Sequence, residues 1–156
     1  MTAAKAHSKS ASIMCLSIGA VGDCLTFHHQ KPSSPTMAPS PLPEFVYKIV
    51  PSAPPTPIPS EYPLSELDRK DGFVHLSVGS QIPITADLFF KDVTTIWVLK
   101  LRFAPKFHSA TTWEVEGCPH LYGNFGAEDV DSVKQLSRLD GESWKEALKK
   151  ESDWLV

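Results

Sequence analysis

The ten residues TTIWVLKLRF, at positions 94–103, form the strongest strand pattern of the chain. Alternate residues of a strand face opposite sides, so Ile96 and Val98 would share one face and Leu99 and Leu101 the other. Both faces are apolar, which is typical of a strand covered on both sides. The segment therefore predicts the central strand of a sheet that lies between two layers.

Weaker patterns flank this strand on both sides. Strands are predicted at FVYKIV (Phe45–Val50), at FVHLS (73–77) and at 111–116, whereas residues 130–136 fit either a strand or a helical turn. Helical patterns cover residues 65–70, with Ser65 as the N-cap, residues 81–90 and residues 142–150. Because strands and helices interleave irregularly, the predicted class is α+β in a single domain.

Length and charge exclude several classes of protein. The 156 residues suit one domain, which is large enough to fold without a disulfide or metal. The net charge of −3 gives no overall basic field of the kind that binds nucleic acid. No apolar run approaches the roughly 20 residues of a bilayer span. We therefore expect neither nucleic acid nor a membrane as a partner, and the sequence does not identify a protein partner.

The prolines mark a boundary, because eleven of the fourteen lie between Pro32 and Pro63. Proline fixes φ and lacks an N–H group, so the tract before Pro43 is predicted to be an extended linker. We expect a disordered Pro/Ser-rich tail and linker at residues 1–43 and the domain at 44–156. For residues 1–26 the alternatives are a targeting segment, a disordered tail, or an over-long gene model whose true start is Met37.

Few motifs suggest a metal or a disulfide. The three cysteines form no CxxC pair, which favours a reducing, cytoplasmic location. Glu66, Asp68 and Asp71 cluster before a turn, but their spacing matches no calcium loop. We predict a solvated charged turn there and no metal site.

Two histidines lie in unusual surroundings. His75 is flanked by large apolar residues and followed by Ser77, and His120 precedes Tyr122 and Gly123. An inward-facing imidazole needs hydrogen-bonding partners. A bound polar ligand would use such imidazoles, hydroxyls and uncovered backbone. The alternative is that each histidine only braces a loop.

The adjacent Trp113 and Glu114 leave two possibilities open. On a strand they face opposite sides. If Trp113 packs in the core, Glu114 is exposed and ordinary. If Glu114 instead points into a cleft, its carboxylate can polarise a hydroxyl or stabilise a developing cation.

These motifs together carry a resemblance to a known family. DGFVHLS (71–77), the Phe89-Phe90 pair, WE (113–114) and PHLYG (119–123) occur in an order and spacing that resemble the domain of unknown function 952 family. The resemblance covers residues 45–154. It implies a fold similar to the ADP-ribosyltransferase superfamily, with two small, split, mainly antiparallel sheets and an NAD-binding cleft between them.

The resemblance also implies roles for individual residues. In that superfamily an early strand holds the nicotinamide ribose, aromatic rings stack on the nicotinamide, and an acid orients the ribose. Carried over, the site has Glu114, His75 and His120 as catalytic residues and Ser77, Trp113, Tyr122 and Gly123 as ligand-binding residues.

The implied function is a small intracellular protein with a His-lined polar cleft for NAD or a related nucleotide. If the protein is catalytic, the expected reaction is attack at the ribose C1′ with loss of nicotinamide, as in a transferase or a glycohydrolase. The alternative is a non-catalytic module that binds another small ligand or a peptide.

Overall fold

The computed structural model describes residues 38–156. The expected targeting segment, the possible start at Met37 and residues 1–37 of the expected tail and linker lie outside the described residues. The short described segment 38–43 leads directly into the first strand.

The first sheet is built around the strand that the sequence marks most clearly. Its order is β1 (Phe45–Val50), β3 (Thr95–Arg102) and β6 (Val130–Ser137), and both pairings are antiparallel. The central position of β3 is confirmed. The segment that fitted either strand or helix is the edge strand β6, because it pairs along β3 with one irregularity, at Lys100 and Leu101.

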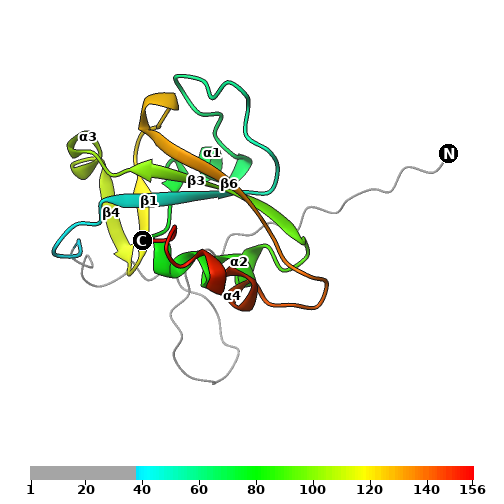
Figure 1. Cartoon of the computed structure of the whole chain (residues 1–156). Helices are drawn as coiled ribbons and strands as arrows, with labels where there is room; N and C mark the ends of the chain where they lie inside the picture. The colour runs from blue at the N-terminus through cyan, green and yellow to red at the C-terminus, as the bar shows by residue number, and fades with distance from the viewer. Residues whose placement is uncertain (1–37) are drawn as a thin grey trace, which may run out of the picture.

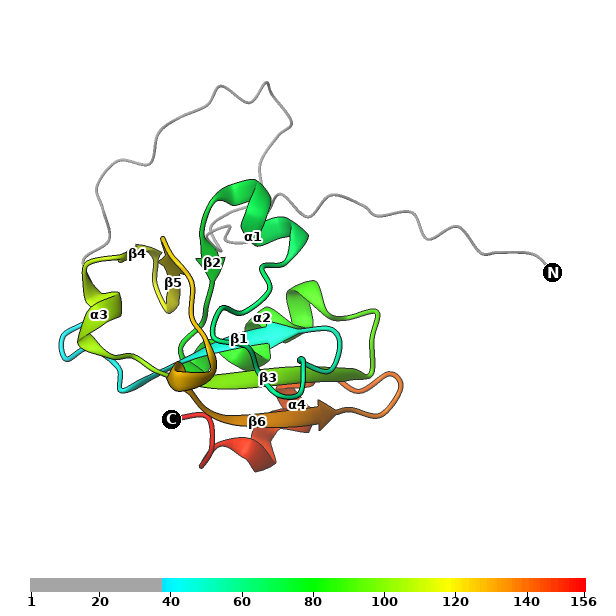
Figure 2. The same cartoon turned by 90° about the horizontal axis from the view of Figure 1, so that it is seen from above.

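The second sheet is smaller and has the order β2 (Val74–His75), β5 (Cys118–Leu121) and β4 (Thr111–Val115), again antiparallel. Figure 2 shows it as a layer separate from the first sheet, with α1 (Glu66–Asp71) beside β2. The predicted strand at 73–77 is wrong in its extent. Only two of its residues pair in this sheet, because Ser77 already pairs with Tyr47 of the first sheet.

Helices cover the opposite face of the first sheet. Figure 1 shows α2 (Ile82–Phe89) and α4 (Trp144–Ala147) side by side below it. The predicted helix at 142–150 is wrong in its bounds, because the Ser143 side chain caps α4 and the chain tightens after Ala147 into a 3₁₀ turn, η3 (Leu148–Glu151). The remaining short elements are η1 (Gly79–Gln81), α3 (Pro105–His108) and η2 (Ala127–Asp129).

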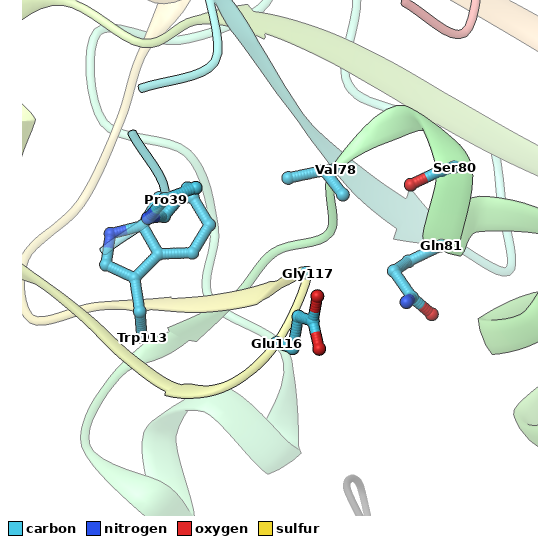
Figure 3. Close-up of a pocket in the computed structure, with 7 residues that line it drawn as sticks. All are labelled: Pro39, Val78, Ser80, Gln81, Trp113, Glu116 and Gly117. Atoms are coloured by element: carbon cyan, nitrogen blue, oxygen red, sulfur yellow. The ribbon is translucent and has the colours of Figure 1, made fainter. Parts of the chain in front are cut away.

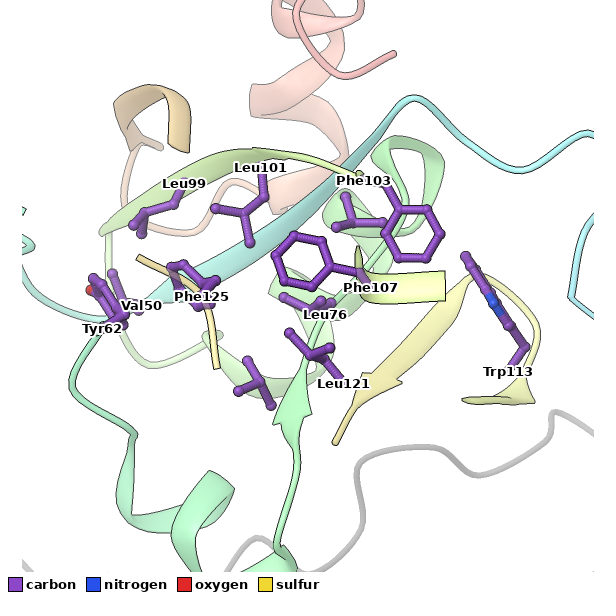
Figure 4. Packing of buried hydrophobic residues seen from close by; sticks show 12 residues of the cluster. Val50, Tyr62, Leu76, Leu99, Leu101, Phe103, Phe107, Trp113, Leu121 and Phe125 are labelled. Atoms are coloured by element: carbon purple, nitrogen blue, oxygen red, sulfur yellow. The ribbon is translucent and has the colours of Figure 1, made fainter. Parts of the chain in front are cut away.

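Two hydrophobic cores follow from the alternation along β3. Leu99 and Leu101 belong to the core between the two sheets, together with Leu121 and Trp113 of the second sheet. Figure 4 shows Trp113 at the far end of this core from Leu99. Ile96 and Val98 face α2 and α4 and meet the fully buried Trp144, among others. The molecule therefore has the layers second sheet, first sheet and helices, which confirms the α+β class with two small antiparallel sheets.

Within the described part of the chain, no helix has both the length and the hydropathy needed to span a membrane.

Candidate functional site

The pairing of β2 with β5 brings the two predicted histidines together. His75 lies directly opposite His120 in the antiparallel register. Their ring centroids are 5.5 Å apart, with the ring planes at 67°. Each residue is less than one-tenth exposed. Two imidazoles that are 45 positions apart in the sequence thus form one cluster.

The second sheet has an apolar face and a polar face. Val74 and Leu121 point into the core between the sheets. The alternation of a strand then places their neighbours His75 and His120 on the opposite face. Across β4 and β5, Thr112 pairs with His120. A row of polar side chains thus crosses all three strands, and we call this side of the second sheet the polar face.

Aromatic rings cover the imidazoles on the polar face. The ring of Phe73 stacks on His120 at a centroid distance of 4.2 Å and lies 4.7 Å from His75. It is also 5.3 Å from the ring of Tyr122, which is 48% exposed. Of these four rings, Tyr122 is the one that a ligand in solvent can most readily reach.

His75 is held by a buried carboxylate, that of Asp68, which the sequence analysis assigned to a solvated charged turn. Asp68 is 1% exposed, and its Oδ1 lies 2.8 Å from Nδ1 of His75. The ammonium group of Lys48 on β1 donates to both oxygens of Asp68, at 2.8 and 2.7 Å. Burial by itself would raise the pKa of Asp68, but the hydrogen bond with His75 and the charge of Lys48 outweigh it and hold that pKa far below its usual range. Asp68 is therefore a carboxylate at neutral pH.

Local sequence explains how Asp68 is turned inward. Ser65 caps α1 and forms a capping box with Asp68, in which each side chain bonds the backbone N–H of the other residue. Gly72 ends the helix in the left-handed conformation, with φ of 80°. The helix is only six residues long, so both ends fix the carboxylate against β2.

A second carboxylate approaches the other nitrogen of the same ring. Oδ2 of Asp71 lies 3.4 Å from Nε2 of His75, and the Asp71 side chain is 26% exposed. The expectation of a solvated charged turn is therefore wrong for Asp68, which is fully buried, and Asp71 is only partly exposed. The reason is that Lys48 and His75 together compensate the charge of Asp68 inside the fold.

His120 is placed differently. Its Nδ1 lies 3.5 Å from Oε2 of Glu114 and has no hydrogen-bond partner among the described residues. Burial lowers the pKa of His120, and the neighbouring His75 lowers it further, against an opposing effect of Glu114. The Glu114 side chain is 46% exposed. The neutral imidazole is favoured here, with an unused polar atom close to a solvent-accessible carboxylate.

The other predicted site residues divide between two regions. Tyr122 and, after it in the chain, Gly123 lie at the end of β5 beside the polar face. Ser77 pairs with Tyr47 of the first sheet, and its hydroxyl lies 3.4 Å from that of Thr85 on α2. Its polar contacts are thus with the first sheet and α2, away from the imidazoles.

Trp113 belongs to the core and not to the polar face. It is 6% exposed and packs with Phe103 in an edge-to-face arrangement. Its indole also lines a cavity of about 320 Å³ (Figure 3). The lining residues of this cavity are Pro39, Val78, Ser80, Gln81, Trp113, Glu116 and Gly117. Neither imidazole lines this cavity. Trp113 and the two histidines, which the sequence analysis placed in one site, therefore lie in different regions of the molecule.

Lys48 and Asp68 are the residues that sequence reasoning missed. A signal was present in each case. Asp68 stands three positions after the predicted cap Ser65, where a capping box turns the side chain back toward the chain. Lys48 lies between Val46 and Val50 in the alternation of β1, on the face that enters the core. A lysine at such a position needs a buried acid.

No group of three or more His, Cys, Asp or Glu side chains within residues 38–156 is arranged to hold a metal ion.

Comparison with known proteins relates this site to a protein family. Residues 58–133 match the model of the family described as "Protein of unknown function (DUF952)". The chain is thus similar to this family over 76 of its 156 residues. The match to DUF952 contains the whole second sheet together with Asp68, whereas Lys48 lies before it. The polar face therefore lies within the segment that resembles the family.

Solved structures of one bacterial protein have a similar fold. The crystal structure of protein CC0527 from Caulobacter crescentus is 26% identical, with a TM-score of 0.56, and the match covers 70% of this chain and 98% of that one. A solution NMR structure of CC0527 aligns at 21% identity with a TM-score of 0.53, covering 69% and 96%. No curated protein matches significantly. Neither the DUF952 description nor these structures name an activity or a ligand, so the likeness to ADP-ribosyltransferases stays a prediction.

Proposed function

We propose that the polar face of the second sheet binds the nicotinamide-ribose end of NAD or of a related nucleotide. The observation that carries this proposal is the register of β2 and β5, which sets His75 opposite His120, with Glu114 3.5 Å from the second ring. Ligand sites typically combine a few convergent polar groups with aromatic surface. Both are present here, because Phe73 lies against the imidazoles and the half-exposed Tyr122 lies against Phe73.

Charge supports the nicotinamide end over the phosphates. The side chains around the two rings include three carboxylates, Asp68, Asp71 and Glu114, and one ammonium group, Lys48. Before the imidazoles are counted, the sum is −3 + 1 = −2. A phosphate would be repelled by this surplus, whereas the cationic nicotinamide ring of NAD would be attracted. The aromatic ring of Tyr122 can stack on the same cation.

The same arrangement can act on the ribose. When the bond between C1′ and the nicotinamide nitrogen breaks, the ring leaves as a neutral molecule with the bonding electrons, and positive charge develops at C1′. The carboxylate of Glu114 would stabilise this charge. Water then attacks C1′ and releases its proton to Glu114 or to solvent. The neutral imidazole of His120 would accept or donate a hydrogen bond at the ribose hydroxyls.

A second function, a non-catalytic binding module, is favoured by one observation. Both imidazoles are more than nine-tenths buried, and the more accessible polar groups are Glu114 and Tyr122 at the rim. A site of this kind can bind a ligand at its edge without enclosing a reacting bond.

Isothermal titration calorimetry on the full chain tests the binding proposal. We expect NAD and nicotinamide mononucleotide to bind and ADP-ribose, which lacks the cationic ring, to bind more weakly. His120→Gln should reduce the affinity for the mononucleotide, and the matched surface control Lys149→Gln should leave it unchanged. The absence of binding by all three compounds at millimolar concentration, in a sample that NMR shows to be folded, would disprove the proposal.

A nicotinamide-release assay separates the two functions. If the protein is a glycohydrolase, NAD is turned over by the wild type, and Glu114→Gln loses turnover while it still binds NAD. Binding by the wild type without any turnover favours the module.

A further inference from the structure

The Asp68 carboxylate accepts more hydrogen bonds than its place in a helix cap requires. Oδ1 receives the Lys48 ammonium at 2.8 Å and the backbone N–H of His75 at 3.0 Å, and it faces Nδ1 of His75 at 2.8 Å. Oδ2 receives the Lys48 ammonium at 2.7 Å and the hydroxyl of Ser65 at 2.6 Å. Lys48 also donates to the backbone carbonyl of His75, at 3.2 Å. Asp68 therefore holds both the backbone and the ring of His75.

This contact decides which nitrogen of His75 carries its proton. A carboxylate has only acceptor atoms, so Nδ1 can bond to Asp68 only as an N–H donor. In the neutral ring the other nitrogen, Nε2, then has a free lone pair. Free histidine has no such constraint, and a hydrogen bond to a buried carboxylate is strong enough to favour this tautomer by about tenfold or more.

Nε2 of His75, which does not contact Asp68, lies beside a second hydrogen-bond acceptor. Nε2 of His75 and Oδ2 of Asp71 are 3.4 Å apart, so the neutral ring and this carboxylate form a pair of adjacent acceptors. Two neighbouring donors on a ligand are complementary to such a pair. The adjacent hydroxyls of a ribose have this chemistry, whereas the anionic pyrophosphate linkage of a dinucleotide has only acceptors and does not fit this pair.

We propose that Asp68 is a positioning residue that fixes the proton of His75 on Nδ1, so that Nε2 and Asp71 together accept hydrogen bonds from the two adjacent hydroxyls of a ribose. The role of Asp68 stands on the ligand-free geometry, and the ribose as ligand rests on the proposed function. Lys48 and Ser65 serve this role by holding the carboxylate in place from the first sheet and from the helix cap.

The tautomer of His75 can be measured without any ligand. In the full chain labelled with ¹⁵N-histidine, the imidazole nitrogen shifts of the neutral ring distinguish a proton on Nδ1 from one on Nε2. We expect His75 in the Nδ1–H form by about tenfold or more. A neutral His75 with its proton on Nε2 would overturn the positioning role, and this result needs no variant to fold.

A double variant tests whether Asp68 causes the preference. Lys48→Met/Asp68→Leu replaces the buried ion pair by apolar side chains, an exchange that folded proteins often tolerate. The Nδ1–H preference should disappear in this variant, and the control Ser65→Ala, which keeps the carboxylate, should retain it. An unchanged tautomer in the folded double variant would contradict the proposal.

Two matched compounds test the ligand. Nicotinamide mononucleotide should bind the wild type about tenfold more tightly than its 2′-deoxy analogue, because the analogue leaves one acceptor of the pair unpartnered. Equal affinities would refute the ribose contact and leave the proposed function standing. Failure of both compounds to bind would remove the ribose contact and the proposed function together, while the tautomer still decides the role of Asp68.

Discussion

His75 and His120 lie opposite each other on adjacent strands of the polar face, yet their surroundings differ. His75 has a carboxylate near each ring nitrogen, and one of these, Asp68, is tied to the first sheet through Lys48. His120 has an unbonded Nδ1 and a half-exposed neighbour, Glu114. The comparison indicates that the framework of the site holds His75 through Nδ1 and leaves Nε2 for a ligand, whereas Nδ1 of His120 has no hydrogen bond within the described fold.

The largest loss of stability is expected when the ion pair between Lys48 and Asp68, which holds His75 in place, is broken. Lys48→Met leaves the carboxylate of Asp68 buried without its cation, and breaking such a pair typically costs about 3–5 kcal/mol. Urea unfolding of the wild type and the variant measures the loss. The double variant Lys48→Met/Asp68→Leu should regain much of it, because neither charge remains. A loss below about 1 kcal/mol for the single variant would mean that Asp68 is not held by Lys48.

The comparison itself is tested by making the same change at each histidine. His75→Gln removes a hydrogen bond to a buried carboxylate and should reduce the free energy of unfolding by about 1.5–3 kcal/mol. His120→Gln removes no hydrogen bond at Nδ1 and should cost about 1 kcal/mol or less. Chemical denaturation of both variants supplies the two values. Equal losses at the two positions would remove the distinction between a histidine that the fold holds through a carboxylate and one that it does not.

The pH dependence gives a smaller effect with a definite sign. Burial lowers the folded-state pKa of His120 below its unfolded value, so between these two values the unfolded chain binds more protons than the folded one. The stability contributed by His120 is then fully present above about pH 6.5 and is lost as the pH falls toward the folded-state pKa. Denaturant unfolding at a series of pH values gives the free energy of unfolding at each pH. This free energy should vary less with pH in His120→Gln than in the wild type. A steeper dependence in the variant would show the opposite shift.

The smallest effect on stability is expected at the rim. Glu114 is nearly half exposed and 3.5 Å from His120, so Glu114→Gln should change the unfolding free energy by no more than about 0.5 kcal/mol. Thermal unfolding of this variant is the measurement. A substantial loss would place Glu114 in the framework with Asp68 and would weaken its proposed role at the ribose.

Local pattern sufficed for much of the fold. The alternation of apolar residues placed β3 at the centre of its sheet and assigned Ile96 and Leu99 to opposite cores. The start of α1 followed from the predicted cap Ser65. Helix 142–150 was less well predicted, since Ser143 caps α4 and the chain tightens into a 3₁₀ turn after Ala147. The backbone N–H of Trp144 also donates to Asp87 on α2, which is far away in the sequence.

Only part of the candidate site could be predicted from local sequence patterns. The chemistry of an imidazole near hydroxyls, glycines and aromatic rings drew attention to His75 and His120, and the register of β2 with β5 joined them. Trp113 was expected at the same place, but its alternation with Glu114 puts it in the core on the other side of the strand.

The sequence by itself determined the central strand β3, the cap of α1 and the choice of the two histidines, because strand alternation and helix capping act between residues a few positions apart. Only the tertiary structure decided that Lys48 reaches Asp68, 20 positions away, and that Asp68 in turn holds His75. A buried ion pair forms only when packing brings its members together and excludes water, and no local pattern records which distant charge will compensate another.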